Sequence, residues 1–231
     1  MTDSSTELMR LDLHNHTRGS FDCLSDPEAL LRKALDRGVD RMAITDHNAL
    51  DVALHMAERH PDRIIPGEEI KTAEGIDVIG LYLQAVIPKG TPAVETCQRI
   101  RDQGGIAYLP HPFAGGKGGG GTHVERLVPH IDVIEVFNAR LHPGRLNALA
   151  EEVASREGLL RVAGSDAHTI GEIAGAGVTV PRHENTAEAL LAALAGATVW
   201  GETAPWLVHL ASTFAKVARP AIARTGRYAR E

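Results

Sequence analysis

Residues 11–22 read LDLHNHTRGSFD, a short apolar run that ends in two histidines and is followed by an aspartate. In a strand, side chains two positions apart point to the same face, so His14 and His16 would present two imidazoles side by side. Two neutral imidazoles form a natural pair of metal ligands. The alternative is that both histidines are ordinary polar residues at an exposed strand end, and the rest of the chain must decide between the two.

Further short apolar runs along the chain also end in ionisable side chains. Helix-like segments separate most of these runs, the first at residues 25–38, with Asp26 as the expected N-cap and Pro27 in the first turn. The strand ends together carry His14, His16, Asp22, Asp46, His47, Glu69, His111, Glu135, Asp166 and His168. Strands that alternate with helices favour parallel pairing through right-handed crossovers, so these ends should meet at one edge.

The sequence favours a distorted (β/α) barrel of the α/β class. In a closed barrel the C-terminal strand ends share one rim, whereas an open doubly wound sheet gathers ligands at a single crevice. One pair of runs, residues 63–70 and 76–83, breaks the alternation because the short turn between them predicts a hairpin. We therefore expect a barrel whose strict alternation is interrupted once.

The composition is that of an ordinary globular protein. The 231 residues carry a formal net charge of −6, which argues against a duplex-DNA-binding protein held mainly by phosphate contacts. The aromatic content of 4% leaves few platforms for stacking along single-stranded nucleic acid. The two cysteines, an N-terminus unlike a leader and the absence of a membrane-length apolar run predict a cytoplasmic protein.

We expect one main domain with two short extensions. Residues 1–9 form the expected disordered N-terminus, residues 10–205 the main domain, and residues 206–231 a basic C-terminal tail. Such a tail can bind an anionic surface, but a solvated end is the commoner explanation. The glycine-rich stretch 112–121, which contains Lys117, is expected to be either a mobile flap over a substrate or a surface insertion.

The mixture of candidate ligands indicates a catalytic metal centre. Imidazoles and carboxylates without thiolates suit Zn, Mn or Fe and differ from the ligands of structural zinc sites. Any one of these side chains could be a buried polar group, but so many at equivalent strand ends are hard to explain without metal. We expect open coordination positions and bridging carboxylates, which are typical of centres that activate water.

Five motifs resemble those of the PHP (polymerase and histidinol phosphatase) metallohydrolases. They are HNHT, ITDH, GEE, PHP and GSDAH, which occur in the family's order between about residues 10 and 200. The resemblance implies a distorted seven-stranded barrel with two or three divalent metal ions at the C-terminal rim. It also implies which strand-end residues hold each ion. The first ion would take His14, His16, Glu69 and Asp166. The third would take Asp22, His47 and His168. Glu69 would also bridge to a second ion that takes His111.

Two features of this chain bear on the second ion. Family phosphatases often carry a histidine early in the strand after the bridging glutamate, whereas here Asp77 is the nearby candidate. The predicted hairpin would place Asp77 close to Glu69. Glu68 and Glu69 are adjacent and point to opposite faces, so only one should bind metal, and the G-x-E pattern selects Glu69.

Three further residues are candidates for the reaction itself. Asp46 would orient a ligand through a hydrogen bond or carry a proton. Arg18, which follows HNHT, and Arg140, in the family-like stretch EVFNAR, are candidates to bind a phosphate, although Arg140 could equally be a surface arginine. Glu135 and Asn138 lie three positions apart on one run, so they face opposite ways unless the strand bends.

The resulting prediction is a metal-dependent phosphoesterase that hydrolyses a phosphomonoester through a metal-activated water. The substrate would be a nucleotide or another small phosphorylated metabolite. An exonuclease acting on short oligonucleotides is one alternative. Others are an amidohydrolase-type metal hydrolase, although no strand-end lysine stands out as a bridge between two ions, and a catalytically inert scaffold, although nearly all the ligands are present.

Overall fold

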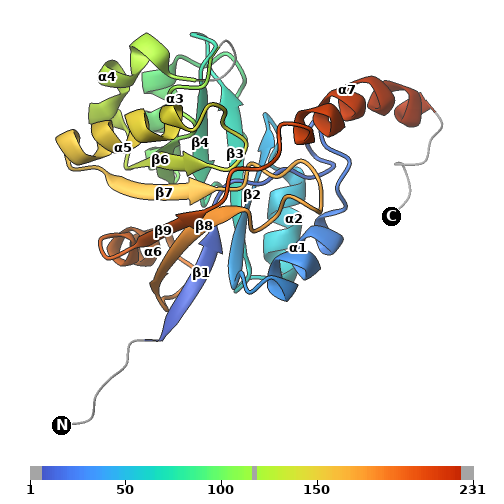
Figure 1. The fold of residues 1–231 in the computed structure, drawn as a ribbon, viewed down its shortest axis with the longest axis horizontal. Helices are drawn as coiled ribbons and strands as arrows, with labels where there is room; N and C mark the ends of the chain where they lie inside the picture. Colours follow the sequence, from blue (N-terminus) through green and yellow to red (C-terminus); the bar gives the residue numbers. More distant parts are fainter. Residues whose placement is uncertain (1–6, 116–118, 225–231) are drawn as a thin grey trace.

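The computed structural model describes residues 7–115 and 119–224, and its centre is one nine-stranded sheet (Figure 1). The strands lie in the order β7-β6-β5-β4-β3-β2-β1-β8-β9. Their bounds are β1 Leu8–Asp12, β2 Arg41–His47, β3 Ile64–Lys71, β4 Asp77–Leu81, β5 Ile106–Leu109, β6 Val133–Asn138, β7 Leu160–Gly164, β8 Ala176–Pro181 and β9 Thr198–Gly201. The α/β class that the sequence predicts is confirmed.

Strands β1 to β7 form a nearly closed barrel. β1, β2 and β3 are parallel, as are β5, β6 and β7, whereas β4 is antiparallel to both of its neighbours. The barrel closes just beyond β1 and β7, where a parallel bridge joins Asn15 to Ala167 and the His16 N–H donates to the Ala167 carbonyl at 2.9 Å. The predicted hairpin is confirmed as β3–β4, in which Lys71 pairs with Asp77.

The sheet has two strands more than the seven that the family resemblance implied. β8 pairs antiparallel with β1 from Leu8 to Leu11, and β9 pairs antiparallel with β8. The bridge that closes the barrel joins Asn15 to Ala167, beyond the ends of β1 and β7. The edge of β1 itself therefore stays unpaired with β7 and pairs with β8 instead. The barrel is therefore confirmed, and the nine strands of the sheet differ from the expected seven by β8 and β9, which extend it beyond β1.

Most helices pack on the outer face of the barrel. The helices are α1 Pro27–Asp36, α2 Asp51–Arg59, α3 Ala93–Asp102, α4 Val124–Leu127, α5 Arg145–Glu157, α6 Ala187–Leu194 and α7 Val208–Arg224. Because alternate strand residues face opposite sides, Met42 and Ile44 of β2 pack in the core between strands and helices, while Ala43 packs inside the barrel. Asp26 caps α1 as expected by accepting a hydrogen bond from the Ala29 N–H.

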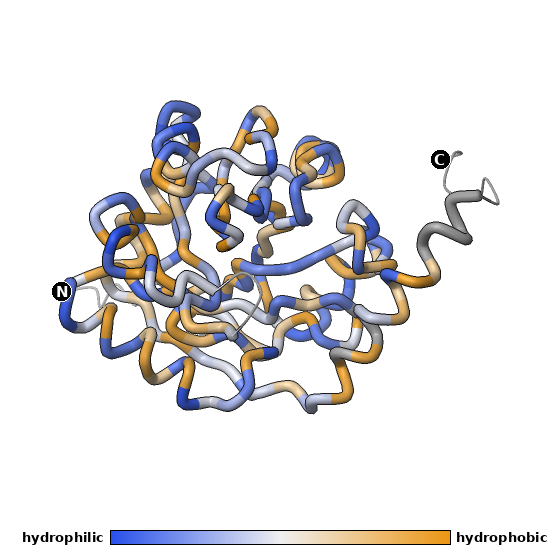
Figure 2. Tube along the Cα trace, turned by 90° about the horizontal axis from the view of Figure 1, so that it is seen from above, coloured by the Kyte–Doolittle hydropathy of each residue, from blue (hydrophilic) through white to orange (hydrophobic). Residues whose placement is uncertain are grey.

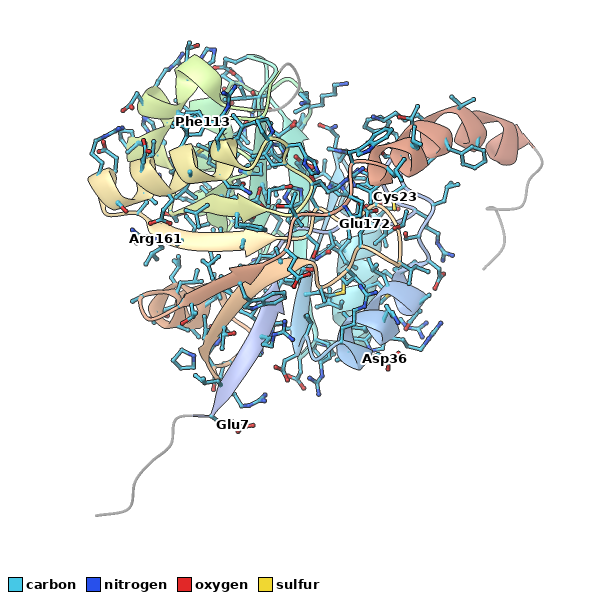
Figure 3. All side chains as sticks on the ribbon, in the orientation of Figure 1. Glu7, Cys23, Asp36, Phe113, Arg161 and Glu172 are labelled. Atoms are coloured by element: carbon cyan, nitrogen blue, oxygen red, sulfur yellow. The ribbon has the colours of Figure 1, made fainter. Side chains whose placement is uncertain are left out.

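Helix α7 differs from the others in its position. It projects from one side of the molecule instead of lying along the barrel (Figures 1 and 2). In Figure 3, Cys23 and Glu172 lie on the side from which α7 projects, and Glu7 lies at the opposite end. Neither α7 nor any other helix within the described residues has the length and apolar character needed to cross a membrane.

Candidate metal centre

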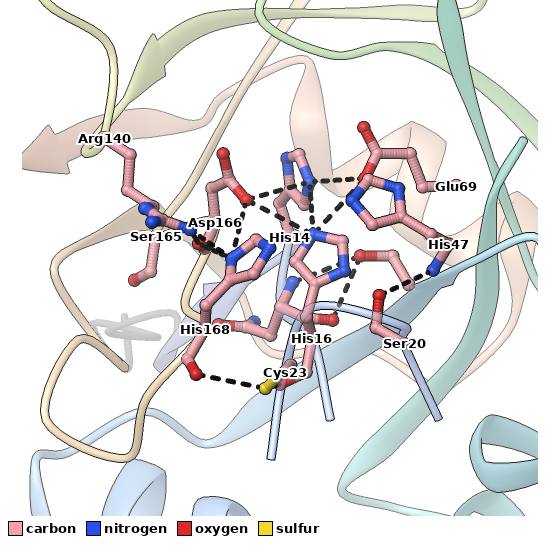
Figure 4. A network of polar contacts seen from close by, with 12 residues as sticks. His14, His16, Ser20, Cys23, His47, Glu69, Arg140, Ser165, Asp166 and His168 are labelled. Atoms are coloured by element: carbon pink, nitrogen blue, oxygen red, sulfur yellow. Dashed lines mark hydrogen bonds and ion pairs between the residues drawn. The ribbon is translucent and has the colours of Figure 1, made fainter. Parts of the chain in front are cut away.

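Glu69 of β3 is the centre of the site. It is buried, and its Oε2 atom lies 3.4 Å from His14 Nε2, 3.3 Å from His16 Nε2 and 3.1 Å from His47 Nδ1. Its other oxygen, Oε1, lies 3.1 Å from His111 Nε2. Figure 4 shows how the imidazoles of His14 and His16, which follow β1, and of His47 at the end of β2 gather around this carboxylate. The parallel strands thus bring side chains from distant positions in the sequence to one point.

Asp166 approaches the same imidazoles from the loop after β7. Its Oδ1 atom lies 3.2 Å from His16 Nε2 and 3.7 Å from His14 Nε2, and these two nitrogens are 3.2 Å apart. The backbone of Asp166 is left-handed, with φ of +52°, and His111 has φ of +28°. Such conformations cost non-glycine residues about 1–3 kcal/mol and cluster at functional sites. The strain at both positions is therefore consistent with selection for side-chain placement.

Asp22, His47 and His168 form an adjoining cluster. Asp22 comes from the loop after β1, with Oδ1 3.4 Å from His168 Nε2 and Oδ2 3.6 Å from His47 Nε2. Ring nitrogens of His16, His47 and His168 all lie within 4.8 Å of one another. His47 faces Glu69 through Nδ1 and Asp22 through Nε2, so it joins the two clusters.

The donor atoms fit divalent metal ions. Two more triads in the described part of the chain, His14–Glu69–His111 and His14–His16–Asp166, have ligand atoms within 4.8 Å of one another. Glu69 Oε2 has no hydrogen-bond partner among the described residues, although imidazole nitrogens surround it. A buried carboxylate oxygen without a hydrogen bond amid ring nitrogens is suited to a cation among them.

Burial and neighbouring charges act in opposite directions on these groups. Burial, together with nearby His168 and His47, lowers the pKa of His16 to about 3. Burial also opposes protonation of His14, but the surrounding carboxylates, Asp166 first among them, raise its pKa well above the ordinary range. Burial favours the neutral form of Asp166, yet the charge of His14 holds the pKa of Asp166 well below its usual value. The carboxylates around His14 thus favour positive charge at this position, which a bound ion would supply.

Glu135 of β6 makes four contacts beneath the cluster. Its Oε1 atom accepts from the Tyr108 hydroxyl at 2.5 Å and lies 3.1 Å from His14 Nδ1. Its Oε2 atom accepts from the His111 N–H at 2.7 Å and from Asn138 Nδ2 at 2.9 Å. A β-bulge directly after Glu135 lets Glu135 and Asn138 reach the same side although they lie three positions apart. A carboxylate at Nδ1 leaves Nε2 of the histidine for a metal ion.

Asp77 lies at the expected end of the β3–β4 hairpin. It lines the same cavity as Glu69, and burial, followed by the charge of Glu69, raises its pKa. Its Oδ1 atom lies 2.5 Å from Lys71 Nζ, and it is outside the three triads, so its role as a ligand stays a prediction. Glu68 accepts a hydrogen bond from the Ile87 N–H at 2.9 Å instead of contacting the cluster.

Asp46 lies beneath the loop after β1 and does not line the cavity. Its Oδ1 accepts from the Thr17 N–H at 2.6 Å and its Oδ2 from the Thr17 hydroxyl at 2.5 Å. A Cβ atom added to Gly19 would lie 2.2 Å from Asp46 Oδ2, so the close approach requires glycine. Burial raises the pKa of Asp46 to about 6. Asp46 thus holds Thr17, the residue after His16, and its predicted role in orienting a ligand or carrying a proton stays a prediction.

The two arginines that were candidates for phosphate binding lie in different surroundings. Arg18 Nη1 pairs with Asp26 Oδ2 at 2.9 Å, and Arg18 does not line the cavity. Arg140 is buried and lines the cavity, its Nη1 contacts His168 Nδ1, and its Nε lies 3.2 Å from Glu172 Oε1. Lys117 of the glycine-rich stretch lies outside the described residues.

Members of all three triads open into one cavity of about 680 Å³. The cations on its wall are Lys71, Lys89, Arg140 and Lys216. Pockets for small molecules usually enclose roughly 300–1,000 Å³ and hold a few converging polar groups. The arrangement is therefore suited to a small anionic substrate placed against a metal cluster.

Comparisons with known proteins identify relatives. A model of the PHP domain matches residues 12–113, and a model described as PHP-associated matches residues 144–199. The chain is 35% identical over 155 residues to the uncharacterized protein MJ1587 of Methanocaldococcus jannaschii, which covers 62% of this chain and 89% of the relative. It is 36% identical over 173 residues to the uncharacterized protein MJ0417 of the same organism, and this match covers 73% of this chain and 69% of the relative. It is 37% identical over 86 residues to the 5'-3' exoribonuclease Rnm of Escherichia coli, and this match covers 33% of this chain and 29% of that protein.

Solved structures share the barrel fold. A two-domain protein from Bacteroides vulgatus, described as containing a predicted PHP-like metal-dependent phosphoesterase, has a TM-score of 0.65 at 17% identity. The match covers 85% of this chain but 65% of that protein, so this chain spans slightly less than two thirds of its length. The lesion-specific endonuclease PfuEndoQ from Pyrococcus furiosus has a TM-score of 0.61 at 13% identity, and the match covers 84% of this chain and 58% of that protein. Together with the sequence relatives, these matches confirm the resemblance, and the chain belongs to the PHP family of metal-dependent hydrolases.

Proposed function

We propose that the protein is a metal-dependent phosphoesterase that hydrolyses the phosphomonoester of a nucleotide or another small phosphorylated metabolite. The observation that carries this proposal is the convergence of imidazoles from separate strand ends on the buried carboxylate of Glu69, at 3.1–3.4 Å. The cavity into which Glu69 opens is lined by lysines and an arginine, and this positive charge supports the proposal of an anionic substrate.

The ligands divide among two or three ions, and the sets are those implied by the family resemblance. His14, His16, Glu69 and Asp166 would hold the first ion. Asp22, His47 and His168 would hold the third. Glu69 and His111, with Asp77 nearby, would hold the second. Zn, Mn and Fe suit such imidazole and carboxylate donors, and when bound they lower the pKa of water to about 7 and offset negative charge on a phosphoryl group.

The remaining residues of the site would bind and orient. Arg140 lines the cavity, and its Nη1 atom lies 3.4 Å from the Asp166 carbonyl and contacts His168. Since Glu172 also holds its Nε at 3.2 Å, the guanidinium is fixed before substrate arrives. A pre-oriented guanidinium can bind phosphoryl oxygens without a cost of reorganisation. Glu135 would keep His14 in the tautomer that ligation needs.

Short oligonucleotides are the second candidate substrate class. Rnm is named a 5'-3' exoribonuclease, and PfuEndoQ is described as a lesion-specific endonuclease. Lys71 and Lys89 on the cavity wall could contact a second phosphate of such a chain. The small molecule is favoured because the cavity volume of about 680 Å³ is that of a small-molecule pocket, and because few aromatic side chains are available for stacking.

A substrate panel tests the proposal. Purified protein reconstituted with Mn, Zn or Fe would be assayed on p-nitrophenyl phosphate, nucleotides, sugar phosphates, short oligonucleotides and a cyclic amide. We expect turnover of small phosphomonoesters. A preference for oligonucleotides would replace the proposal with the exonuclease, turnover of the amide alone would refute phosphoester chemistry, and a protein that binds no metal and lacks activity would be a scaffold.

Two ligand variants sharpen the test. His16→Ala and Asp166→Ala should each abolish turnover, because both residues contribute to the same triad. Far-UV circular dichroism should remain that of the wild type. His60→Ala is the matched control, since His60 pairs with Glu28 and does not line the cavity. Retention of activity in Asp166→Ala would contradict the proposed ligand set.

A further inference from the structure

Helix α7 reaches the metal centre from outside the part of the chain that the family models match. The second match ends at residue 199, and α7 begins at Val208. The helix nevertheless contacts two residues of the site, Arg140 and Asp22. The motifs that identify the family lie outside α7, so they indicate no role for this helix.

One face of α7 packs against Arg140. The Nη2 atom of Arg140 donates to Ser212 Oγ at 3.1 Å and to the Val208 carbonyl at 3.4 Å. Ser212 and Ala215 are buried. Because helix residues four positions apart lie on one face, Val208, Ser212 and Lys216 form a single row that faces the barrel.

Lys216 brings this row to the cavity. Its Nζ atom lies 3.5 Å from Asp22 Oδ2 and 5.4 Å from the centre of the Phe21 ring. The side chain lines the cavity and is 44% exposed, so a ligand in the cavity can reach the ammonium group. The lysine thus places a positive charge directly beside the Asp22–His47–His168 cluster.

We propose that Lys216 is a substrate-binding residue and that α7 completes the active site; this inference rests on the proposed phosphoesterase function. A divalent ion held by Asp22 and the ammonium beside that carboxylate would repel each other over a short distance. An anionic phosphoryl oxygen bound between them would offset this repulsion. An ammonium on a flexible stem, with three donors, is well suited to that oxygen. Ser212 would be a positioning residue that acts through Arg140.

The competing explanation is that Lys216 forms only an ion pair with Asp22. In that case its loss would change metal binding and leave phosphate binding intact. Phosphate affinity and metal content are therefore the two quantities to compare. Lys216→Met removes the charge and keeps an unbranched helix-forming side chain, while Lys216→Arg keeps the charge.

The experiment uses the full chain reconstituted with metal. The dissociation constant of inorganic phosphate would be measured by calorimetry, KM and kcat on the best phosphomonoester, and metal content by elemental analysis. For Lys216→Met we expect about a tenfold weaker affinity for phosphate and a similar rise in KM, the size of one charged hydrogen bond, with kcat within about threefold of wild type. Metal content should not change, and Lys216→Arg should recover most of the affinity.

Two control variants separate this role from general effects. Lys33→Met removes a lysine of α1 that does not line the cavity, and Val217→Ala changes an exposed neighbour on α7. Both should behave as wild type. An unchanged phosphate affinity and KM in Lys216→Met would overturn the inference, and so would a loss of metal with intact phosphate binding.

The proposed function and this inference can fail separately. If the wild type hydrolyses no phosphomonoester but binds phosphate, and Lys216→Met weakens that binding about tenfold, the phosphoesterase proposal fails and the role of Lys216 stands. If the wild type hydrolyses phosphomonoesters and Lys216→Met is unaffected, only the role of Lys216 fails. If the wild type neither binds phosphate nor hydrolyses a phosphomonoester, both are overturned.

Discussion

Replacing Glu135 by glutamine tests whether the contacts beneath the cluster control metal binding. Both oxygens of Glu135 are engaged: Oε1 with Tyr108 and His14, and Oε2 with the backbone of His111 and with Asn138. Glutamine has nearly the same shape, but one of its two terminal atoms is an NH₂ donor instead of an acceptor. The substitution therefore changes hydrogen bonding with little change in packing.

Neither orientation of the new amide satisfies all four partners. If its nitrogen replaces Oε2, it faces two donors, the His111 N–H and Asn138 Nδ2. If it replaces Oε1, it faces His14 Nδ1, which must then accept, so the proton of the neutral imidazole moves to Nε2. Nε2 is the atom that lies 3.4 Å from Glu69 Oε2. Either arrangement disturbs a ligand of the proposed metal centre.

Loss of such a supporting contact typically weakens metal binding by about 10–100-fold, or about 1.4–2.8 kcal/mol. We expect a loss in this range for Glu135→Gln, measured by titrating metal-free protein with Zn or Mn in competition with a chelator. Tyr108→Phe is the matched control, since it removes one donor to Glu135 and leaves the pair with His14 intact. A metal affinity of Glu135→Gln within twofold of wild type, or an equal loss in Tyr108→Phe, would refute the reasoning.

Three further predictions concern stability and reactivity. Chelation of bound metal by EDTA should lower the melting temperature, because an ion at 100 times its dissociation constant stabilises the fold by about 2.7 kcal/mol; an unchanged melting curve would contradict the metal centre. Gly164→Ala would place a Cβ 2.3 Å from the Cβ of His14, so urea unfolding should show a free energy of unfolding lower by about 2–3 kcal/mol. Gly75→Ala is the comparison: its φ is +80° but the space around it is open, so the free energy of unfolding should fall by only about 1 kcal/mol. Burial raises the pKa of the Cys23 and Cys97 thiols to about 11, so iodoacetamide at pH 8 should modify both slowly until the protein is unfolded; fast labelling of the native protein would disagree.

Local patterns made the centre of the site predictable. The spacing of His14 and His16 put both imidazoles on one face of an extended segment, and their Nε2 atoms lie 3.2 Å apart. Strand–helix alternation indicated that the strand ends share a rim, and the short turn before Asp77 indicated the hairpin that inverts β4. These features depend on neighbouring residues in the sequence, so they can be recognised without the fold.

Other parts of the site depended on a β-bulge and on side-chain pairings that no local sequence pattern predicts. The bulge after Glu135 brings Asn138 to the side that Glu135 faces, whereas a regular strand would have separated these two side chains. Arg18 follows the HNHT motif directly, yet its partner is Asp26 and it does not line the cavity. Proximity in the sequence to a ligand was therefore a poor guide to proximity in space.

The sequence by itself determined which donor side chains share a face, because residue types and their spacing along strands specify this locally. Tertiary structure decided which distant side chains meet. His14 and Glu135 are separated by 121 positions, and they touch because closure of the barrel brings them together. In the same way, packing of α7 against Arg140 brings Lys216 to the cavity, far along the chain from the motifs that identify the family. Such contacts arise from the summed packing of the whole barrel, which no single segment encodes.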